Sequence, residues 1–214
     1  MGASGADWAP EAAALAEHGE VIAPDRPGYG SRPAPEGYVG TTVLEQSEDL
    51  ARTIAEEADG PVLLAGRDFG ALVGLDVLLR RPELVAGAVL VAPPLYSLVA
   101  EATDVLTAER IALGEKLHDA GPRAAMEAWL GRTTDADPAA FFADYAGITT
   151  LPVTRRELRG IVRPVLVLTG PRPEAHVRAA AAALVKALPQ GRLEDGADVV
   201  AAVLGVLDEV RASS

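Results

Sequence analysis

The sequence has no cysteine, only three histidines and few aromatic residues, which make up 4% of the chain. Without cysteine there is no disulfide, no thiolate metal ligand and no cysteine nucleophile. The histidines, His18, His118 and His176, lie far apart and show none of the short spacings typical of metal sites. We therefore expect no metal ion and no other cofactor.

Long apolar runs and positive charge are also scarce. No stretch approaches the roughly 20 apolar residues that a membrane-spanning helix needs. The N-terminus lacks a basic segment followed by an apolar one, so we expect no signal peptide and a cytoplasmic location. The net charge is −12, and an acidic surface repels phosphate backbones and anionic membranes. These features predict a small-molecule substrate, with no nucleic-acid partner and no membrane contact.

Helix and strand signals alternate along the chain. Short apolar runs bounded by glycine, proline or polar residues predict strands, and amphipathic segments between them predict helices. The strands are expected at 21–23, 62–65, 88–91, 165–168 and, more weakly, 192–193. Strands of continuous apolar residues that are separated by helices indicate an α/β fold, a parallel sheet flanked by helices on both faces.

Residues 95–160 differ from the rest because they hold helical pieces and no strong strand signal. The pieces lie at 98–119, 122–130 and 138–145, and Gly121-Pro122 separates the first two. The sequence therefore predicts a core made of residues 1–94 and 161–214, with a helical cap inserted at 95–160.

A glycine-rich turn, Gly66-Arg67-Asp68-Phe69-Gly70, joins the strand at 62–65 to the next helix. In this context Gly-x-Asp-x-Gly is a nucleophile-elbow motif, which exposes its central side chain above the carboxyl edge of the sheet. The backbone N–H of Phe69 would face the same place and could help to bind an oxyanion. The alternative is that Asp68 only caps the helix, which is worth about 0.3–1 kcal/mol in any protein.

Three segments, VIAPDRPGYG (21–30), 62–94 and RPVLVLTG (163–170), resemble the recurring segments of the α/β-hydrolase superfamily in their usual order. Aspartate at the elbow resembles the epoxide hydrolase and haloalkane dehalogenase branches. The resemblance implies an α/β-hydrolase fold with a helical cap. It also implies that Asp68 attacks carbon to form an ester, which a histidine-activated water hydrolyses. The expected function is hydrolysis of a small apolar substrate: an ester, an epoxide or a carbon–halogen compound.

The sequence departs from the superfamily at the catalytic histidine. The resemblance places this histidine after the last strand, where Asp198 stands instead. An aspartate is a poor general base at neutral pH because its pKa is too low. His176 is the nearest substitute, with Glu174 to orient it, although a solvent-exposed helix histidine is the alternative. Because this histidine is missing, the alternative that the chain is a non-catalytic or non-hydrolytic relative of the superfamily stays open.

The second departure is at the N-terminus. The superfamily has three strands before its first helix, and the third ends in a turn that donates an oxyanion N–H. Here the chain begins inside that turn, so Ala3 or Ser4 would be its remnant, and we expect a truncated chain, a wrong start site or a gene fragment. If the chain is complete, the absence of the third strand leaves a gap in the sheet. In that case the two strands beside the gap pair directly, or a second chain supplies a strand. An open sheet edge would favour a homodimer, and the oligomeric state stays open.

Two tyrosines complete the candidate site. Epoxide hydrolases use cap tyrosines to protonate the epoxide oxygen, so the resemblance makes Tyr145 a candidate acid. The alternative is a core aromatic residue beside Phe141 and Phe142. Tyr96 follows the strand at 88–91 and is a further candidate for substrate binding.

Overall fold

The computed structural model describes residues 1–100, 102–196 and 198–213. The chain divides into two compact units. The first unit comprises Met1–Thr41 and Ala100–Gly147, and the second comprises Thr42–Val99 and Ile148–Ser214.

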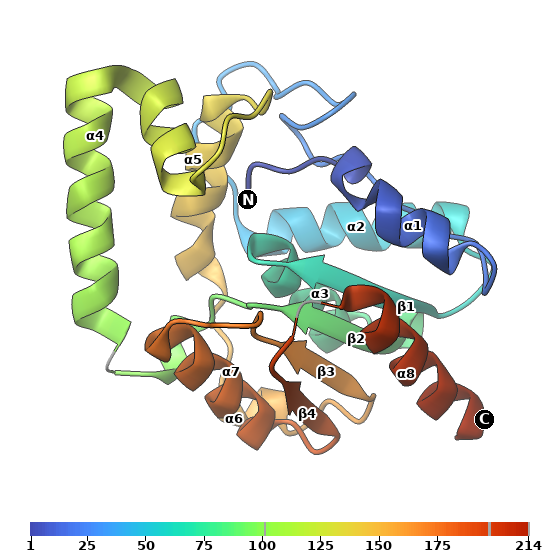
Figure 1. The fold of residues 1–214 in the computed structure, drawn as a ribbon. Coiled ribbons are helices and arrows are strands. Elements are labelled where there is room, and N and C mark those ends of the chain that lie inside the picture. Colours follow the sequence, from blue (N-terminus) through green and yellow to red (C-terminus); the bar gives the residue numbers. More distant parts are fainter. Residues whose placement is uncertain (101, 197, 214) are drawn as a thin grey trace. The chain divides into compact units, whose positions relative to one another are not determined.

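The second unit is built on a four-stranded sheet with the order β1-β2-β3-β4 (Figure 1). Its strands are β1 (Val62–Arg67), β2 (Val85–Val91), β3 (Val165–Leu168) and β4 (Gly191–Glu194). All neighbouring pairs are parallel. The predicted α/β class, a parallel sheet flanked by helices, is therefore confirmed, and the four later strand signals lie within the observed strands.

Helices connect these strands in the alternating order that the sequence predicts. They are α2 (Val43–Glu57), α3 (Phe69–Arg80), α6 (Arg155–Leu158), α7 (Ala175–Ala187) and α8 (Val199–Ala212), with single 3-10 turns η2 (Pro82–Leu84), η3 (Tyr96–Leu98) and η4 (Ile148–Thr150). A capping box begins α2, in which the Glu45 N–H donates to the Thr42 hydroxyl and the Thr42 N–H donates to the Glu45 carboxylate.

Helices α3 and α8 cover opposite faces of the sheet (Figure 1). A methyl group at Gly74 of α3 would meet Leu64 and Leu90, at 3.9 and 3.8 Å. A methyl group at Gly87 of β2 would instead meet Val206 of α8 at 2.8 Å. Because alternate strand residues face opposite sides, this places the two helices on different faces, and the core fills both layers.

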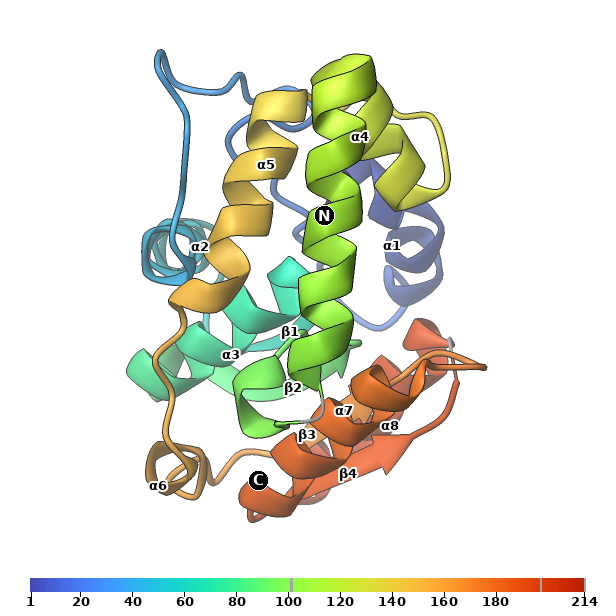
Figure 2. The ribbon, with the colours of Figure 1, turned by 90° about the vertical axis from the view of Figure 1, so that its left-hand side faces the viewer.

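The first unit is helical. It contains the 3-10 turn η1 (Gly5–Trp8), α1 (Ala9–Leu15), α4 (Ala102–Leu130) and α5 (Pro138–Gly147). Helix α4 is kinked at Gly121, which has a φ of 81° and precedes Pro122, so the predicted break between two helical pieces is confirmed. Helices α4 and α5 pack side by side (Figure 2), with Trp129 against Phe141. The division into core and cap at residues 95 and 160 stays a prediction.

The strand expected at 21–23 is wrong, because the structure assigns no strand to these residues. Val21 is 40% exposed, and Pro24 ends the apolar run after three residues. A strand this short has few hydrogen bonds to offer and needs a paired neighbour to persist. Among the described residues, no helix has both the length and the apolar character needed to cross a membrane.

Candidate active site

Asp68 is the single residue between β1 and α3, and its backbone is strained. Its φ and ψ are 49° and −121°, a region that residues with a side chain rarely adopt. In the described part of the chain only one other non-glycine residue, Ala92, has a positive φ, and it directly follows β2. Strain of this kind costs on the order of 1–3 kcal/mol and tends to collect at functional sites. Both strained residues lie at the carboxyl edge of the sheet.

Hydrogen bonds and a close glycine contact hold this turn. The Asp68 N–H donates to the Val91 carbonyl of β2 at 2.9 Å, and the Asp68 carbonyl accepts from the Ala71 N–H at 2.9 Å. A methyl group at Gly66 would lie 2.5 Å from the Gly70 carbonyl oxygen, so only glycine fits there. A methyl group at Gly70 would have no such neighbour within 4 Å. The tight turn therefore requires a small residue before Asp68 and not after it.

The side chain of Asp68 is exposed and makes no capping hydrogen bond to α3. Helix capping, the alternative role for this aspartate, is therefore not observed. Phe69 is fully buried, and its N–H belongs to the first turn of α3, where backbone amides point out of the helix end. The turn thus presents a carboxylate next to the positive end of a helix.

His176, Glu174 and Tyr96 form a cluster in the same unit. His176 lies in the first turn of α7 and is only 8% exposed, so the alternative of a solvent-exposed histidine is wrong. Its Nδ1 lies 3.6 Å from the Glu174 carboxylate, which is an ion-pair distance and too long for a direct hydrogen bond. The imidazole centroid is 5.3 Å from the ring of Tyr96, at an interplanar angle of 51°.

These residues follow the carboxyl ends of neighbouring strands. Asp68 follows β1, Tyr96 follows β2, and the Glu174–His176 segment follows β3. Adjacent strands are about 4.8 Å apart, so the ends of β1 and β3 are separated by roughly 10 Å. The structure thus brings Tyr96, Glu174 and His176 together and leaves Asp68 on the same edge of the sheet, the edge at which α/β proteins bind ligands.

The segment after β4 is occupied by carboxylates with structural partners. Asp198 begins α8, and its carboxylate accepts the Ala201 N–H at 2.9 Å. Asp195 accepts the Thr169 hydroxyl at 2.8 Å and forms an ion pair with Arg178 at 2.6 Å. The position where the resemblance expects the histidine therefore holds a helix cap. Ala197, between these two residues, lies outside the described residues.

Ala3 and Ser4, the expected oxyanion donors, lie in the first unit. The Ser4 N–H donates to the Asp7 carboxylate at 2.7 Å, and the Ser4 hydroxyl donates to the same oxygen at 3.0 Å. While this capping arrangement holds, the Ser4 amide is not available to an oxyanion. The role of Ala3 stays a prediction. Just before it, the Gly2 carbonyl accepts a hydrogen bond from Arg132 at 2.7 Å.

Tyr145, the candidate acid of the first unit, lies among aromatic rings. Its ring centroid is 6.3 Å from Phe141 and 6.1 Å from Trp129. This is the arrangement of the core-aromatic alternative, and it does not test an acid role. Burial, together with the nearby negative charge of Glu109, raises the pKa of the Tyr145 hydroxyl.

A buried ionic cluster in the first unit was not predicted from the sequence. Asp144 is completely buried and accepts two hydrogen bonds from the Arg26 guanidinium, at 2.7 and 2.6 Å, and one from the Tyr29 hydroxyl at 2.7 Å. Burial, followed by the charge of Asp144, raises the pKa of Tyr29. Arg26 and Tyr29 both belong to the DRPGYG loop, and the charge of Arg26 was the one available signal. The loop is thereby tied to α5.

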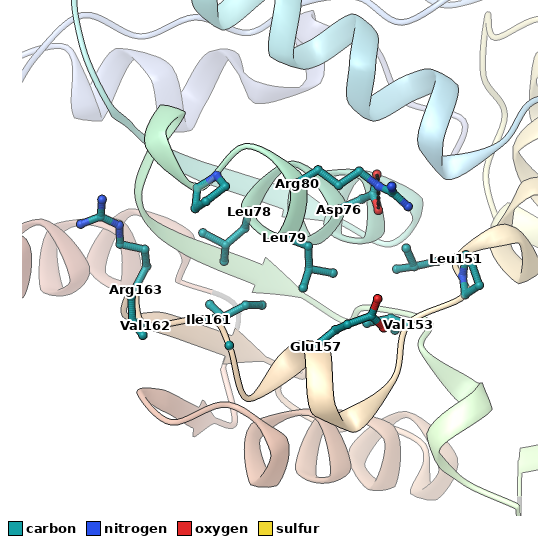
Figure 3. Close-up of a pocket in the computed structure, with 13 residues that line it drawn as sticks. Asp76, Leu78, Leu79, Arg80, Leu151, Val153, Glu157, Ile161, Val162 and Arg163 are labelled. Atoms are coloured by element: carbon teal, nitrogen blue, oxygen red, sulfur yellow. Dashed lines mark hydrogen bonds and ion pairs between the residues drawn. The ribbon is translucent and has the colours of Figure 1, made fainter.

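The second unit also contains a pocket of about 250 Å³ (Figure 3). It lies between the C-terminal end of α3 and the segment 151–163, with Arg80 on one side and Glu157 on the other. Arg80 is already paired with Asp76, and Glu157 with Thr154. Helix α3 has 12 residues, or about 18 Å of axial length, and this separates the pocket from the turn at Asp68. The pocket is therefore not part of the candidate active site.

Comparison with known proteins agrees with this architecture. The candidate carbamate hydrolase RutD of Variovorax paradoxus is 37% identical over 92 residues, which are 42% of this chain and 34% of that protein. Lipase LipV of Mycobacterium tuberculosis is 31% identical over 121 residues, 55% of this chain and 43% of the lipase. The chain thus spans about a third of the carbamate hydrolase and less than half of the lipase.

A carboxylesterase structure from the thaumarchaeon Nitrososphaera gargenis superposes with a TM-score of 0.80 and 15% identity, covering 100% of this chain and 89% of that one. At this identity the likeness shows the fold alone. The alpha/beta hydrolase family matches residues 1–206, nearly the whole sequence. The chain therefore belongs to the α/β-hydrolase family.

Proposed function

We propose that this chain hydrolyses a small apolar substrate, an ester, an epoxide or a carbon–halogen compound, with Asp68 as the nucleophile. The observation that carries the proposal is the strained backbone of Asp68, with a φ of 49° at the single residue between β1 and α3. An ordinary loop residue would relax, whereas a nucleophile gains from being held in one exposed orientation. The absence of a capping bond from its side chain agrees with this role.

The chemistry follows from an ionised carboxylate. A carboxylate is itself a nucleophile and needs no base for the first attack. With a haloalkane or an epoxide, one oxygen of Asp68 forms a bond to the substrate carbon, and the halide or the epoxide oxygen leaves with the electron pair, giving an ester of Asp68. With an ester substrate the bond forms to the acyl carbon, the alkoxide leaves with the electron pair and is protonated to the alcohol, and the intermediate is a mixed anhydride. Water then attacks the Asp68 carbonyl carbon of either intermediate and passes one proton to the base, and the alcohol or acid departs with the other proton as the Asp68 carboxylate is restored.

His176 is the proposed base for the second step. Its Nδ1 faces the Glu174 carboxylate at 3.6 Å, which favours a proton on Nδ1 and leaves the lone pair of Nε2 for the water. Catalytic hydrogen bonds are often long in the absence of substrate, so the distance is compatible with Glu174 orienting the imidazole. Glu174 would also stabilise the imidazolium that forms.

The substrate class rests on charge and on the relatives. The net charge of −12 disfavours anionic substrates, so a neutral molecule is expected. The names of the relatives, a carbamate hydrolase, a lipase and a carboxylesterase, support carbonyl substrates as the first to test. The aspartate at the elbow makes epoxides and haloalkanes the next substrates to test.

The test is multiple-turnover hydrolysis of aryl esters, aryl carbamates, styrene-type epoxides and haloalkanes. Asp68→Asn and Asp68→Ala should abolish turnover without lowering the melting temperature, and His176→Ala should slow it strongly. Asp59→Asn, at an exposed carboxylate outside the cluster, is the matched control and should keep full activity. Turnover that survives in both Asp68 variants would reject this carboxylate as the nucleophile.

A second candidate is a non-catalytic or non-hydrolytic member of the family. The observation that favours it is the hydrogen bond from Ala201 to Asp198, because a helix cap stands where the resemblance expects the base. A well-folded wild-type protein that turns over none of the four substrate classes would support this candidate. Ligand binding without turnover would then be the next measurement.

A further inference from the structure

We infer that Tyr96 is a positioning residue for His176, which fixes the imidazole so that Nε2 is the nitrogen left for acid–base chemistry. The inference rests on the proposed function for its catalytic meaning. Its structural content, the orientation of one imidazole ring, can be measured without any substrate.

The geometry comes from two elements of the second unit that pack together. Tyr96 opens the turn η3 after β2, and His176 is the second residue of α7. Their ring centroids are 5.3 Å apart with an interplanar angle of 51°. This is within the range in which aromatic rings attract one another, worth about 0.5–1.5 kcal/mol beyond simple burial.

A histidine needs such a contact to hold its ring. Rotation about the bond between the imidazole and Cβ has broad minima, so little in the side chain itself decides which nitrogen faces which way. The Glu174 carboxylate is 3.6 Å from Nδ1 and Glu174 is 73% exposed, so it attracts the ring but does not clamp it. The Tyr96 ring lies against the imidazole and restricts this rotation.

Together the two contacts select one arrangement. With Nδ1 toward Glu174, the neutral imidazole carries its proton on Nδ1, and Nε2 keeps the lone pair. Loss of the Tyr96 ring would let the imidazole turn, which brings Cδ2 instead of Nδ1 toward Glu174 and removes the preference for a proton on Nδ1. Because the contact involves the ring, phenylalanine should replace tyrosine here, whereas leucine or methionine should not.

The first readout is the nitrogen spectrum of the three histidines in the intact protein. His18 and His118 are exposed and His176 is buried, and the His176→Ala variant identifies the His176 signals. The wild-type protein and Tyr96→Phe should show His176 with a proton on Nδ1 alone. Tyr96→Leu and Tyr96→Met should show exchange between the two protonated forms. Tyr38→Leu, at a half-buried tyrosine in another part of the chain, should leave the spectrum unchanged.

The second readout is turnover. Tyr96→Leu should lower kcat about ten- to hundred-fold with little change in KM, since a misplaced catalytic group costs rate more than binding. Tyr96→Phe, which keeps the aromatic ring, should have a kcat close to that of the wild type. Unchanged His176 spectra in both Tyr96→Leu and Tyr96→Met, with melting temperatures near that of the wild type, would overturn the inference. If His176→Ala instead keeps full turnover, the proposed base is wrong, while the spectra still decide whether Tyr96 orients the ring.

Discussion

The backbone N–H of Asp68 donates to the carbonyl of Val91, the last residue of β2, at 2.9 Å. This bond continues the sheet one residue past the end of β1, directly into the strained residue. The neighbouring strand therefore fixes Asp68 from one side while the first turn of α3 fixes it from the other. Two rigid elements, and not a flexible loop, hold the candidate nucleophile.

Gly66 and Gly70 flank this turn and should respond differently to alanine. At Gly66 a methyl group would lie 2.5 Å from a backbone oxygen, so Gly66→Ala should lower the free energy of unfolding by about 1–3 kcal/mol and impair turnover. Gly70→Ala meets open space on a helix and should stabilise by about 0.5–1 kcal/mol. Urea unfolding of both variants checks this. Equal effects would mean that the turn is looser than the structure describes.

Relief of the strain at Asp68 should stabilise the protein and end its chemistry. Asp68→Gly removes the side chain from a backbone with a φ of 49°, and the free energy of unfolding should rise by about 1 kcal/mol. Ala92→Gly relieves the other positive φ, 46°, and should stabilise similarly while turnover persists. Thermal unfolding and hydrolysis are measured together. A destabilised Asp68→Gly protein would show that the carboxylate stabilises the fold.

Asp198 allows the missing base to be tested by gain of function. Asp198→Ala should cost about 1 kcal/mol of stability through loss of the cap on α8, and Asp198→Asn should cost little because asparagine caps equally well. Asp198→His should carry the cost of the lost carboxylate cap and, if the family position is catalytically competent here, raise turnover above wild type. Unfolding curves of the three variants measure the loss of the cap, and steady-state kinetics show whether Asp198→His gains turnover.

Much of the second unit could be predicted from the sequence because its signals are local. The apolar runs at 62–65, 88–91 and 165–168 are bounded by glycine, proline or polar residues, and each lies within an observed strand. The Thr-x-x-Glu pattern at Thr42 and Glu45 is also local, and α2 begins at the residue after Thr42. The strand predicted at 21–23 is wrong because a run of three apolar residues does not reveal whether a neighbouring strand is present to pair with it.

The candidate site was only partly predictable, because its environment is built from distant residues. The turn at Asp68 is local and was recognised from five consecutive residues. His176 contacts Tyr96, which lies on another connection of the sheet, and no periodicity in α7 reveals that contact. Likewise Arg26 and Asp144 are 118 residues apart, so their pairing leaves no pattern in the sequence.

The ion pair between Arg26 and Asp144 should show strong coupling. Arg26→Met leaves the completely buried Asp144 carboxylate without its partner and should cost about 3–5 kcal/mol. Asp144→Leu should cost less, because the Arg26 side chain that it leaves is 21% exposed and can reach water. The double variant should cost much less than the sum, since a buried pair can often be replaced by apolar side chains. All four proteins of the cycle carry Tyr29→Phe, because the Tyr29 hydroxyl would lose its acceptor in the variants without Asp144. Additive losses in a double-mutant cycle would mean that the pair does not act as a unit.

Asp25 should make the stability of the first unit depend on pH in the acid range. Hydrogen bonds from the backbone amides of Ser31 and Gly5, both at 2.7 Å, lower the pKa of this carboxyl below its ordinary value of 3.8. A pKa lower in the folded state than in the unfolded state means that the stabilisation is complete above about pH 4 and is lost as the pH falls through the folded value.

The wild type should therefore lose stability below that pH faster than Asp25→Asn, which has no charge to lose. Urea unfolding between pH 2.5 and 7, with Asp59→Asn as the exposed control, measures the difference. Parallel curves for the wild type and Asp25→Asn would show that these amides bind the neutral carboxyl as well as the carboxylate.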